Sequence, residues 1–321
     1  MGNIYSTYQM VFPPKSLFAV DQIPDLTGQV MIVTGGNTGI GKETCKALLN
    51  KNAKVYLAAR SKSRADEAIE WLKSETNGKA PIFLELDLAS LASVRKAAEE
   101  FKQKERELHV LFNNAGVATP PVEQRTADGY DMQFGTNVLG HYFFTTLLLP
   151  TLVHTAKNSP LARGYARVIN TSSIMAFYPP KDGIDWETLG TDANSVQACK
   201  TLGTSTLYGQ SKLGNILFSN ELTKRYGEQG IISSSLHPGG IQTEATRHMS
   251  RLRVAIVALL SYPANYGALT QLWSGTMPEG LTHNGKFLIP WARVGTAPQQ
   301  ALDEKLAEKL WVWFEEQVKG H

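Results

Sequence analysis

The sequence predicts an α/β fold: one doubly wound domain, in which a mostly parallel sheet of seven strands carries helices on both faces. Two observations favour this fold. Short apolar runs alternate with helix-length segments along most of the 321 residues. Such alternation is typical of right-handed βαβ units, whose strands are buried on both faces. The pattern also continues past residue 170 without a linker or an internal repeat, so one domain accounts for it.

The apolar runs and the helical periodicities place the individual elements. Strands are expected at 30–33, 54–59, 81–86, 110–112, 166–171, 231–236 and 285–289. Helices are expected at 42–50, 65–76, 91–106, 129–137, 139–152, 207–226 and 298–318. Irregular structure is expected in an N-terminal arm over 1–24, an insertion over 174–207 and a segment over 242–263. The single doubly wound domain is therefore expected over residues 25–321.

Composition excludes several classes of function. The formal net charge is only +3 and no dense run of Lys and Arg occurs, which argues against a nucleic-acid partner. Cys45, Cys199 and the seven histidines show no metal-ligand spacing, so no metal site is expected. Two cysteines and the lack of a secretory signal in residues 1–20 favour a cytoplasmic location.

The N-terminal arm permits two interpretations. Residues 1–6 fit the M-G-x-x-x-[ST] pattern for myristoylation of Gly2, which would give a weak peripheral contact with an intracellular membrane. The alternative is an irregular arm that packs Phe12, Leu17 and Phe18 on the domain surface. The pattern is short and frequent by chance, so the packed arm is favoured.

A glycine-rich turn follows the first expected strand. Gly35, Gly39 and Gly41 lie between the strand at 30–33 and the helix at 42–50. Glycine lets the backbone take positive φ and approach a ligand closely, and a helix N-terminus offers unpaired N–H groups. The turn therefore predicts a phosphate-binding site, although its spacing differs from the common G-x-G-x-x-G fingerprint.

The end of the second expected strand indicates which nucleotide binds there. Arg60 stands where an NAD site would carry Asp or Glu for the ribose 2′-hydroxyl. An arginine suits a 2′-phosphate instead, because it offers a charge-assisted fork, and Lys62 adds a second cation nearby. The sequence therefore predicts NADP(H) as the cofactor.

Polar residues also close the third and fourth expected strands. Asp87 can accept from an adenine amino group or cap the following helix. Asn113 and Asn114 can bridge neighbouring strand ends, and the small residues Ala115 and Gly116 let the backbone approach the adenosine ribose. Because these residues lie at the carboxyl ends of parallel strands, beside the switch point, a ligand site is favoured over a simple turn.

A second constellation points to proton transfer. Tyr208 and Lys212 are spaced i, i+4, which places them on one face of the expected helix. A phenol titrates near pH 10, so it needs a nearby cation to exchange a proton at neutral pH. Lys212 can serve as that cation. Ser172 and Ser173 end the fifth expected strand, and Asn137 lies in a helix between.

Together these residues resemble the classical-type short-chain dehydrogenase/reductase family, which implies a Rossmann-type fold. The matching pieces, in chain order, are TGGNTGIG at 34–41, NNAG at 113–116, Asn137, the serine pair at 172–173, the YxxxK motif at 208–212 and Pro238-Gly239. More narrowly, 137–141, 208–217 and 237–244 resemble the retinol dehydrogenase-like and WW-domain oxidoreductase-like branch, including fungal light-induced alcohol dehydrogenase-like members.

The resemblance implies a role for each matching residue. Tyr208 would be the general acid/base and Ser173 would hydrogen-bond the substrate oxygen, while Ser172 points away. Lys212 would lower the pKa of Tyr208 and hold the nicotinamide ribose, and Asn137 would position a water for proton relay. The residues expected to bind the cofactor are Gly35, Asn37, Thr38, Gly39, Ile40, Gly41, Arg60, Lys62, Asp87, Leu88, Asn114, Ala115, Gly116, Tyr208, Lys212, Pro238, Gly239, Ile241 and Thr243.

The substrate end is less determined. Residues 251–262 are apolar nearly all round, so as a helix they must be buried or face an apolar partner. A lid over the substrate pocket is expected, with a membrane contact or a protein partner as alternatives. The insertion at 174–207 is either a pocket wall that also covers the Tyr208 helix, where related enzymes often dimerise, or a surface excursion. A monomer and a homodimer both stay open.

The leading hypothesis is an NADPH-dependent carbonyl reductase, equivalently an alcohol dehydrogenase, acting on a hydrophobic ketone, aldehyde or secondary alcohol. One alternative is a membrane-associated retinoid or lipid dehydrogenase of the same family. The other is a non-catalytic scaffold that senses NADP(H), which the complete set of Asn137, Ser173, Tyr208 and Lys212 argues against.

Overall fold

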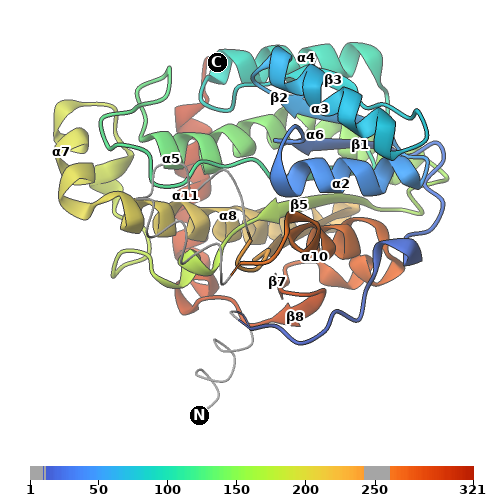
Figure 1. Ribbon diagram of the computed structural model, residues 1–321. Coiled ribbons are helices and arrows are strands. Elements are labelled where there is room, and N and C mark those ends of the chain that lie inside the picture. The colour runs from blue at the N-terminus through green and yellow to red at the C-terminus, as the bar shows by residue number, and fades with distance from the viewer. Residues whose placement is uncertain (1–9, 11, 242–260) are drawn as a thin grey trace.

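A single eight-stranded sheet organises the computed structural model, which describes residues 10, 12–241 and 261–321 (Figure 1). The strand order is β3-β2-β1-β4-β5-β6-β7-β8, and the first seven strands run parallel. Their bounds are β1 Val30–Thr34, β2 Lys54–Ala59, β3 Ile82–Glu85, β4 Val110–Asn113, β5 Ala166–Thr171, β6 Ile231–Leu236, β7 Phe287–Ile289 and β8 Arg293–Gly295. The predicted doubly wound α/β fold is confirmed.

Strand β1 lies in the buried middle of the sheet. All five residues of β1 are buried, and the strand pairs with β2 on one side and with β4 on the other. Strands β2 and β3 are added to one side of β1, and the strands from β4 onward are added to the other side. The connections that follow β1 and β4 therefore lead to opposite faces of the sheet and leave a crevice at the carboxyl ends of these two strands. The glycine turn after β1 borders this crevice.

Helices cover both faces of the sheet (Figure 1). Helices α2, α3 and α10 supply one apolar cluster, and α4, α6, α8 and α11 supply the other. Their bounds are α2 Gly39–Asn50, α3 Lys62–Glu75, α4 Leu91–Lys104, α5 Met132–Phe134, α6 Gly140–Asn158, α7 Ala193–Leu202, α8 Thr204–Tyr226, α10 Ala264–Thr276 and α11 Glu304–Gln317. Each sheet face therefore has its own core, as a doubly wound fold requires.

The last helix completes the core beneath α6 and α8. The Trp311 ring lies 5.1 Å from Tyr142 and 6.0 Å from Phe218, and Phe314 stacks on Tyr142 at 4.6 Å between ring centres. These contacts join α11 to both helices. The insertion also packs on α8, because a Cβ on Gly209 would lie 2.5 Å from the Tyr178 carbonyl oxygen and 2.8 Å from that of Met175. Helix α11 and the insertion therefore both cover α8.

Three elements differ from the sequence expectation. The sheet has eight strands rather than seven, because Arg293–Gly295 turns back to pair antiparallel with β7. The insertion contains helix α7, which begins at the N-cap Asp192. Helix α10, Ala264–Thr276, was not expected, because its buried positions are mostly small or polar and give a weak apolar period.

The expected helices at 129–137 and 139–152 form one bent unit. Short helix α5 leads into a π-helical turn at Gly135–Leu139, which continues directly into α6. In a π-helical turn each hydrogen bond joins residues five apart, one more than in an α-helix. Asn137 lies within this turn.

The N-terminal arm contributes less packing than expected. Phe18 is buried, but Phe12 is 48% exposed and Leu17 is 84% exposed, so the prediction that all three pack on the surface is wrong. Ile23 and Leu26 follow Phe18 into the core because the short 3-10 helix η1 (Val20–Gln22) turns the chain inward. The myristoylation motif at residues 1–6 lies outside the described residues.

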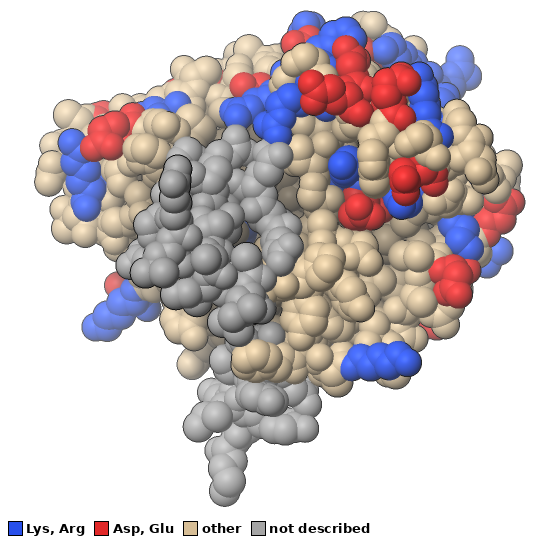
Figure 2. Space-filling model, viewed as in Figure 1, with Lys and Arg blue, Asp and Glu red and all other residues tan. Residues whose placement is uncertain are grey.

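The surface in Figure 2 carries charges of both signs, gathered over α3 and α4. Ion pairs such as Lys62–Asp66, Lys73–Glu70 and Lys104–Glu100 intersperse the two signs along these helices. This face therefore has no extended patch of one sign among the described residues. Within the same residues, no helix is long and apolar enough to cross a bilayer.

Candidate active site

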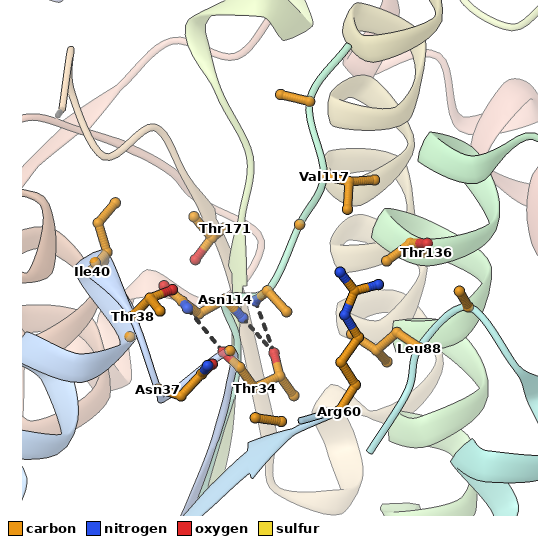
Figure 3. A pocket seen from close by; sticks show the side chains of 18 of the residues that line it. Thr34, Asn37, Thr38, Ile40, Arg60, Leu88, Asn114, Val117, Thr136 and Thr171 are labelled. Atoms are coloured by element: carbon orange, nitrogen blue, oxygen red, sulfur yellow. Dashed lines mark hydrogen bonds between the residues drawn. The ribbon is translucent and has the colours of Figure 1, made fainter. Parts of the chain in front are cut away.

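A cavity of about 470 Å³ lies at the carboxyl edge of the sheet (Figure 3). It extends from the end of β2, past the glycine turn, to the start of α8. The predicted site residues that line it are Gly35, Asn37, Thr38, Gly39, Ile40, Gly41, Arg60, Asp87, Leu88, Asn114, Ala115, Gly116, Ser173, Tyr208, Lys212, Pro238, Gly239 and Ile241. The fold therefore brings residues from both halves of the chain to one cavity.

The glycine turn is tightly wound. Gly35 has φ +66°, and a Cβ on Gly41 would lie 2.3 Å from the carbonyl oxygen of Gly35. Any larger residue at 41 would push the turn apart. Helix α2 begins at Gly39, and its N-cap residue Thr38 makes no side-chain cap bond. The first N–H groups of α2 are thus left to other acceptors, which suits a phosphate.

Thr34 and Asn114 brace this turn from behind (Figure 3). The Asn114 side chain donates to the Thr34 carbonyl oxygen at 2.8 Å, and the Asn114 and Ala115 N–H groups donate to the Thr34 hydroxyl, each at 2.9 Å. Asn113 donates to the Asn170 side chain at 2.9 Å. The two asparagines therefore bridge β4 to β1 and to β5, as the sequence predicts.

One end of the cavity is cationic. Arg60 extends from the end of β2 into the cavity (Figure 3), and Arg64 also lines it. Arg64 was not among the predicted site residues, although a signal existed. It lies in the first turn of α3, where side chains lean back toward the helix N-terminus and so toward the end of β2.

Lys62, by contrast, does not line the cavity. Its ammonium forms an ion pair with Asp66 at 2.8 Å on the exposed face of α3. The i, i+4 spacing on one helix makes that pairing local. The structure therefore places Arg64, rather than Lys62, beside Arg60.

Asp87 follows β3 and holds its own loop. Its Oδ1 accepts from the Ala89 N–H at 2.9 Å, whereas Ser90 is the N-cap residue of α4. The alternative interpretation of Asp87 as the helix cap is therefore wrong. Asp87 and Leu88 both line the cavity.

Ser173 and Tyr208 meet at the other end of the cavity. A hydrogen bond joins their side chains. Ser172 turns the opposite way, and its hydroxyl donates to the Lys212 carbonyl oxygen at 2.6 Å. Successive residues point to opposite sides of an extended chain, so anchoring Ser172 on α8 presents Ser173 to Tyr208.

Lys212 lies beneath the Tyr208 ring. Its ammonium is 5.8 Å from the ring centre and donates to the Thr171 carbonyl oxygen at 3.0 Å. Burial lowers the pKa of Lys212 to about 8. Burial also raises the pKa of Tyr208, and the hydrogen bond with Ser173 opposes this only in part. The expected lowering of the Tyr208 pKa by Lys212 is not found, because desolvation of the phenolate outweighs the other effects.

Asn137 lies behind the cavity rather than in its lining, and its side chain is fully buried. Its Nδ2 donates to the Val117 carbonyl oxygen and to the Ser211 hydroxyl, each at 3.0 Å, and its Oδ1 accepts from the Val117 N–H at 2.8 Å. Asn137 thus ties the loop after β4 to the residue before Lys212. A Cβ on Gly116 would lie 3.2 Å from the Asn137 Oδ1 and 3.3 Å from the Lys212 Nζ, so this contact leaves little room.

The loop after β6 closes the far side. Gly239 has φ +93°, and a Cβ there would lie 2.6 Å from the Trp291 ring, so only glycine fits. Nδ1 of His237 accepts from the Ile174 N–H at 3.1 Å, which ties this loop to the residue after Ser173. Thr243 and residues 251–260 of the expected lid lie outside the described residues. None of residues 174–207 lines the cavity.

Comparisons with known proteins agree with this arrangement. The family model for short chain dehydrogenase matches residues 29–185. A short-chain dehydrogenase/reductase of Armillaria gallica is 52% identical over 321 residues, which is all of both chains. An uncharacterized oxidoreductase of Schizosaccharomyces pombe is 40% identical over 96% of this chain and 90% of its own.

Solved structures show the same fold. An uncharacterized protein from Mycobacterium paratuberculosis superposes with a TM-score of 0.71 at 26% identity, covering 94% of this chain and 97% of its own. Pseudomonas aeruginosa RhlG, solved as an active-site complex with NADP, has a TM-score of 0.62 at 24% identity and covers 83% of this chain and 95% of its own. With relatives this close along its whole length, the chain belongs to the short-chain dehydrogenase/reductase family.

Proposed function

We propose that this protein is an NADP(H)-dependent carbonyl reductase, equivalently an alcohol dehydrogenase, for hydrophobic ketones, aldehydes or secondary alcohols. The observation that carries the proposal is one cavity with Arg60 at one end and Ser173, Tyr208 and Lys212 at the other. The proposal includes membership in the branch of retinol dehydrogenase-like and light-induced alcohol dehydrogenase-like enzymes, because residues 137–141 and 208–217 resemble that branch.

The described residues fit a dinucleotide phosphate. The uncapped N-terminus of α2 offers backbone donors for a diphosphate, beside a turn that only glycine at 41 permits. Arg60 and Arg64 offer guanidinium groups for a 2′-phosphate, and no carboxylate stands at the end of β2 to repel it. When bound, the cofactor supplies or accepts the hydride.

The reacting end supplies the proton and the electrostatics. In reduction, the Ser173 and Tyr208 hydroxyls would donate hydrogen bonds to the carbonyl oxygen, where negative charge develops. Tyr208 would then deliver its proton to that oxygen. The Lys212 ammonium would stabilise the resulting phenolate from beneath the ring, and Asn137 donates to the hydroxyl of the adjoining Ser211 on α8.

The choice of NADP(H) over NAD(H) rests on Arg60 and Arg64. Structures of similar fold bind either nucleotide: one from Burkholderia cenocepacia is a complex with NADP, and a 3-ketoacyl-(acyl-carrier-protein) reductase from Brucella melitensis is a complex with NADH. At 22% and 19% identity these proteins inform the fold alone. The two guanidinium groups therefore carry the assignment.

The proposed partner is the small-molecule substrate, and a monomer is favoured over a homodimer. Support comes from the Trp311 ring of α11, which packs on Phe218 of α8, because cover on the helix where related enzymes often dimerise would hinder pairing there. An apolar substrate is proposed from the composition of residues 251–262, which the structure describes only from 261 onward. A weak peripheral membrane contact through that segment or through Gly2 is part of the same proposal.

The test is an NADPH-oxidation screen over carbonyl compounds of graded size and polarity, with a parallel NADH series. We expect turnover that increases with apolar surface and a kcat/KM at least tenfold higher with NADPH. Equal efficiency with both nucleotides would overturn the cofactor assignment. Tight NADPH binding without turnover of any carbonyl compound would favour the sensing scaffold. Flotation with lipid vesicles distinguishes a membrane-associated enzyme.

A further inference from the structure

A buried histidine connects the two ends of the site. His141 lies in the first turn of α6 and is 2% exposed. Its Nε2 lies 2.9 Å from the Thr34 hydroxyl oxygen, and its Nδ1 lies 2.9 Å from the carbonyl oxygen of Asn137. Thr34 precedes the glycine turn, whereas Asn137 belongs to the reacting end. The ring is thus the only described side chain that bonds both of these residues.

The contacts determine the tautomer of this ring. The Asn137 carbonyl oxygen can only accept, so Nδ1 must carry a hydrogen. Burial lowers the pKa of His141 to about 4, and the nearby charge of Lys212 acts in the same direction, so the ring is neutral at pH 7. A neutral imidazole has a single N–H. Nε2 must therefore accept, and the Thr34 hydroxyl must donate to it.

This requirement also orients the Thr34 hydroxyl. Its one hydrogen points to Nε2 at 2.9 Å rather than to the Phe112 carbonyl oxygen at 3.3 Å. Both of its lone pairs are then directed at the N–H groups of Asn114 and Ala115. Only in this arrangement does Nε2 of His141 also have a partner. The hydroxyl is thereby locked one residue before Gly35, the first glycine of the turn.

The second contact acts on the reacting end. The Asn137 side chain bonds both Val117 and Ser211, and Ser211 immediately precedes Lys212. A shift of the Asn137 backbone therefore moves the contact that holds α8 beside Lys212. Nδ1 of His141 holds that backbone at its place within the π-helical turn.

We propose that His141 is a positioning residue with two separable functions: its Nε2 orients Thr34 for nucleotide binding, and its Nδ1–H holds Asn137 for turnover. Only the kinetic part of this inference rests on the proposed function. The ring touches neither end of the cavity directly, so it acts through the two residues that it bonds.

The first test needs no variant and no substrate. Two-bond ¹H–¹⁵N correlation spectra of protein labelled with ¹⁵N-histidine distinguish the two neutral tautomers from the charged ring. The spectrum of His141→Asn assigns the His141 signals by their loss. We expect a neutral ring protonated on Nδ1 at pH 7. A neutral ring protonated on Nε2, or a charged ring, would overturn the proposal.

The second test separates the two contacts. In His141→Asn, the side-chain amide stands as many bonds from Cβ as Nδ1 does, so it can still donate to Asn137 but cannot reach Thr34. In His141→Gln, the side-chain oxygen stands at the position of Nε2, so it can accept from Thr34 while the bond to Asn137 is lost. Each variant therefore retains one contact.

The two variants should differ in which constant changes. We expect His141→Asn to raise the NADPH dissociation constant about tenfold and to leave kcat at saturating NADPH within about twofold. We expect His141→Gln to lower kcat about tenfold with the dissociation constant within about twofold. If both variants change the same constant to the same extent, the division of functions is wrong.

Thr34→Val and a control histidine complete the design. Thr34→Val removes the contact with His141 together with the bonds from the Asn114 and Ala115 N–H groups, so the double variant with His141→Asn should bind NADPH no more weakly than Thr34→Val alone. Additive losses would contradict a shared contact. His109→Asn alters another buried histidine, which bonds Val30 and Ser159 outside the cavity, and it should leave both constants within about twofold. If wild type reduces no carbonyl compound, the proposed function fails, but the tautomer and the NADPH constants still decide this inference.

Discussion

The Ser172 hydroxyl donates to the backbone carbonyl oxygen of Lys212 at 2.6 Å, which joins the end of β5 to the first half of α8. This bond anchors one serine of the pair on the helix and presents its neighbour to Tyr208. The two adjacent serines therefore have different expected functions, although they look equivalent in the sequence.

Ser173→Ala should lower kcat by about 10²–10³-fold, because it removes a donor to the developing oxyanion. Ser172→Ala is the matched control. It should lower the free energy of unfolding by about 1–3 kcal/mol through the lost buried bond, with a much smaller change in kcat. Steady-state kinetics and chemical denaturation measure the two effects, and a reversed pattern would exchange the serine assignments.

Tyr208→Phe should abolish measurable turnover, since the Ser173 hydroxyl, the other donor to the substrate carbonyl oxygen, is an aliphatic alcohol and a far weaker acid than a phenol. NADPH binding, followed by fluorescence titration, should stay near that of wild type. Tyr178→Phe serves as the control because Tyr178 is 57% exposed and lies outside the cavity lining. Residual activity in Tyr208→Phe close to that of Tyr178→Phe would reject Tyr208 as the general acid.

The raised pKa of Tyr208 sets the direction of the pH dependence. Reduction needs the protonated phenol and the Lys212 ammonium, so its kcat should stay level from neutral pH to about pH 8, where Lys212 begins to lose its proton. Alcohol oxidation needs the phenolate, so its kcat should still rise over the same range. Profiles of kcat against pH in both directions test this. A reduction rate that already decreases as the pH rises from 7 to 8 would show that the pKa of Tyr208 is lowered instead.

Lys212 should cost stability while it serves catalysis. Its pKa is about 8 in the folded protein and 10.5 in an ordinary lysine, so between these values the unfolded chain binds the proton that the folded chain has lost. Stability therefore rises with pH from about 8 toward 10 and carries the full penalty below pH 8. Lys212→Met should be inactive yet more stable by about 1–3 kcal/mol at pH 7, because Asn215 still donates to the Thr171 carbonyl oxygen.

That difference provides its own check. The gap in unfolding free energy between Lys212→Met and wild type should narrow as the pH rises from 8 to 10. A gap that is constant across this range would mean that the lysine charge does not cause it.

Arg60→Ala and Arg64→Ala should each raise the KM for NADPH about ten- to a hundredfold, because each removes charge-assisted bonds to the 2′-phosphate. The KM for NADH should change little. Lys62→Ala is the control within the same turn of chain, and both KM values should stay within about twofold because its ammonium pairs with Asp66. Equal losses with NADPH and NADH would place the arginines elsewhere than at the 2′-phosphate.

The sheet and the cavity were predictable where the signal is local. Strands β2, β5 and β6 have the predicted bounds, and in β2 the signal is the continuous apolar run that a strand buried on both faces favours. The cavity lining follows from the same source. Once the strands are parallel, their carboxyl ends meet at one edge, and Gly41, Arg60 and Tyr208 come together there.

The parts that were missed depend on distant contacts. Strand β8 has only three residues and is stabilised by pairing with β7. Helix α10 packs small residues against other elements, so that a Cβ on Gly275 would meet the Phe112 ring at 2.6 Å or less. The bond of His141 to Thr34 spans 107 positions, and no spacing in the sequence indicates it. The pKa of Tyr208 likewise depends on how much solvent the fold removes.

Helix α11 gives the chain an unusual genetic vulnerability. Every cavity residue named above precedes residue 304, yet the helix from Glu304 to Gln317 completes the core beneath α6 and α8. A stop codon just before this helix would leave every named cavity residue in the chain, but it would expose the Tyr142 and Phe218 rings to water. Such a late truncation is expected to be as severe as loss of Tyr208 itself, with the defect visible as degraded or aggregated protein rather than as an inactive folded enzyme.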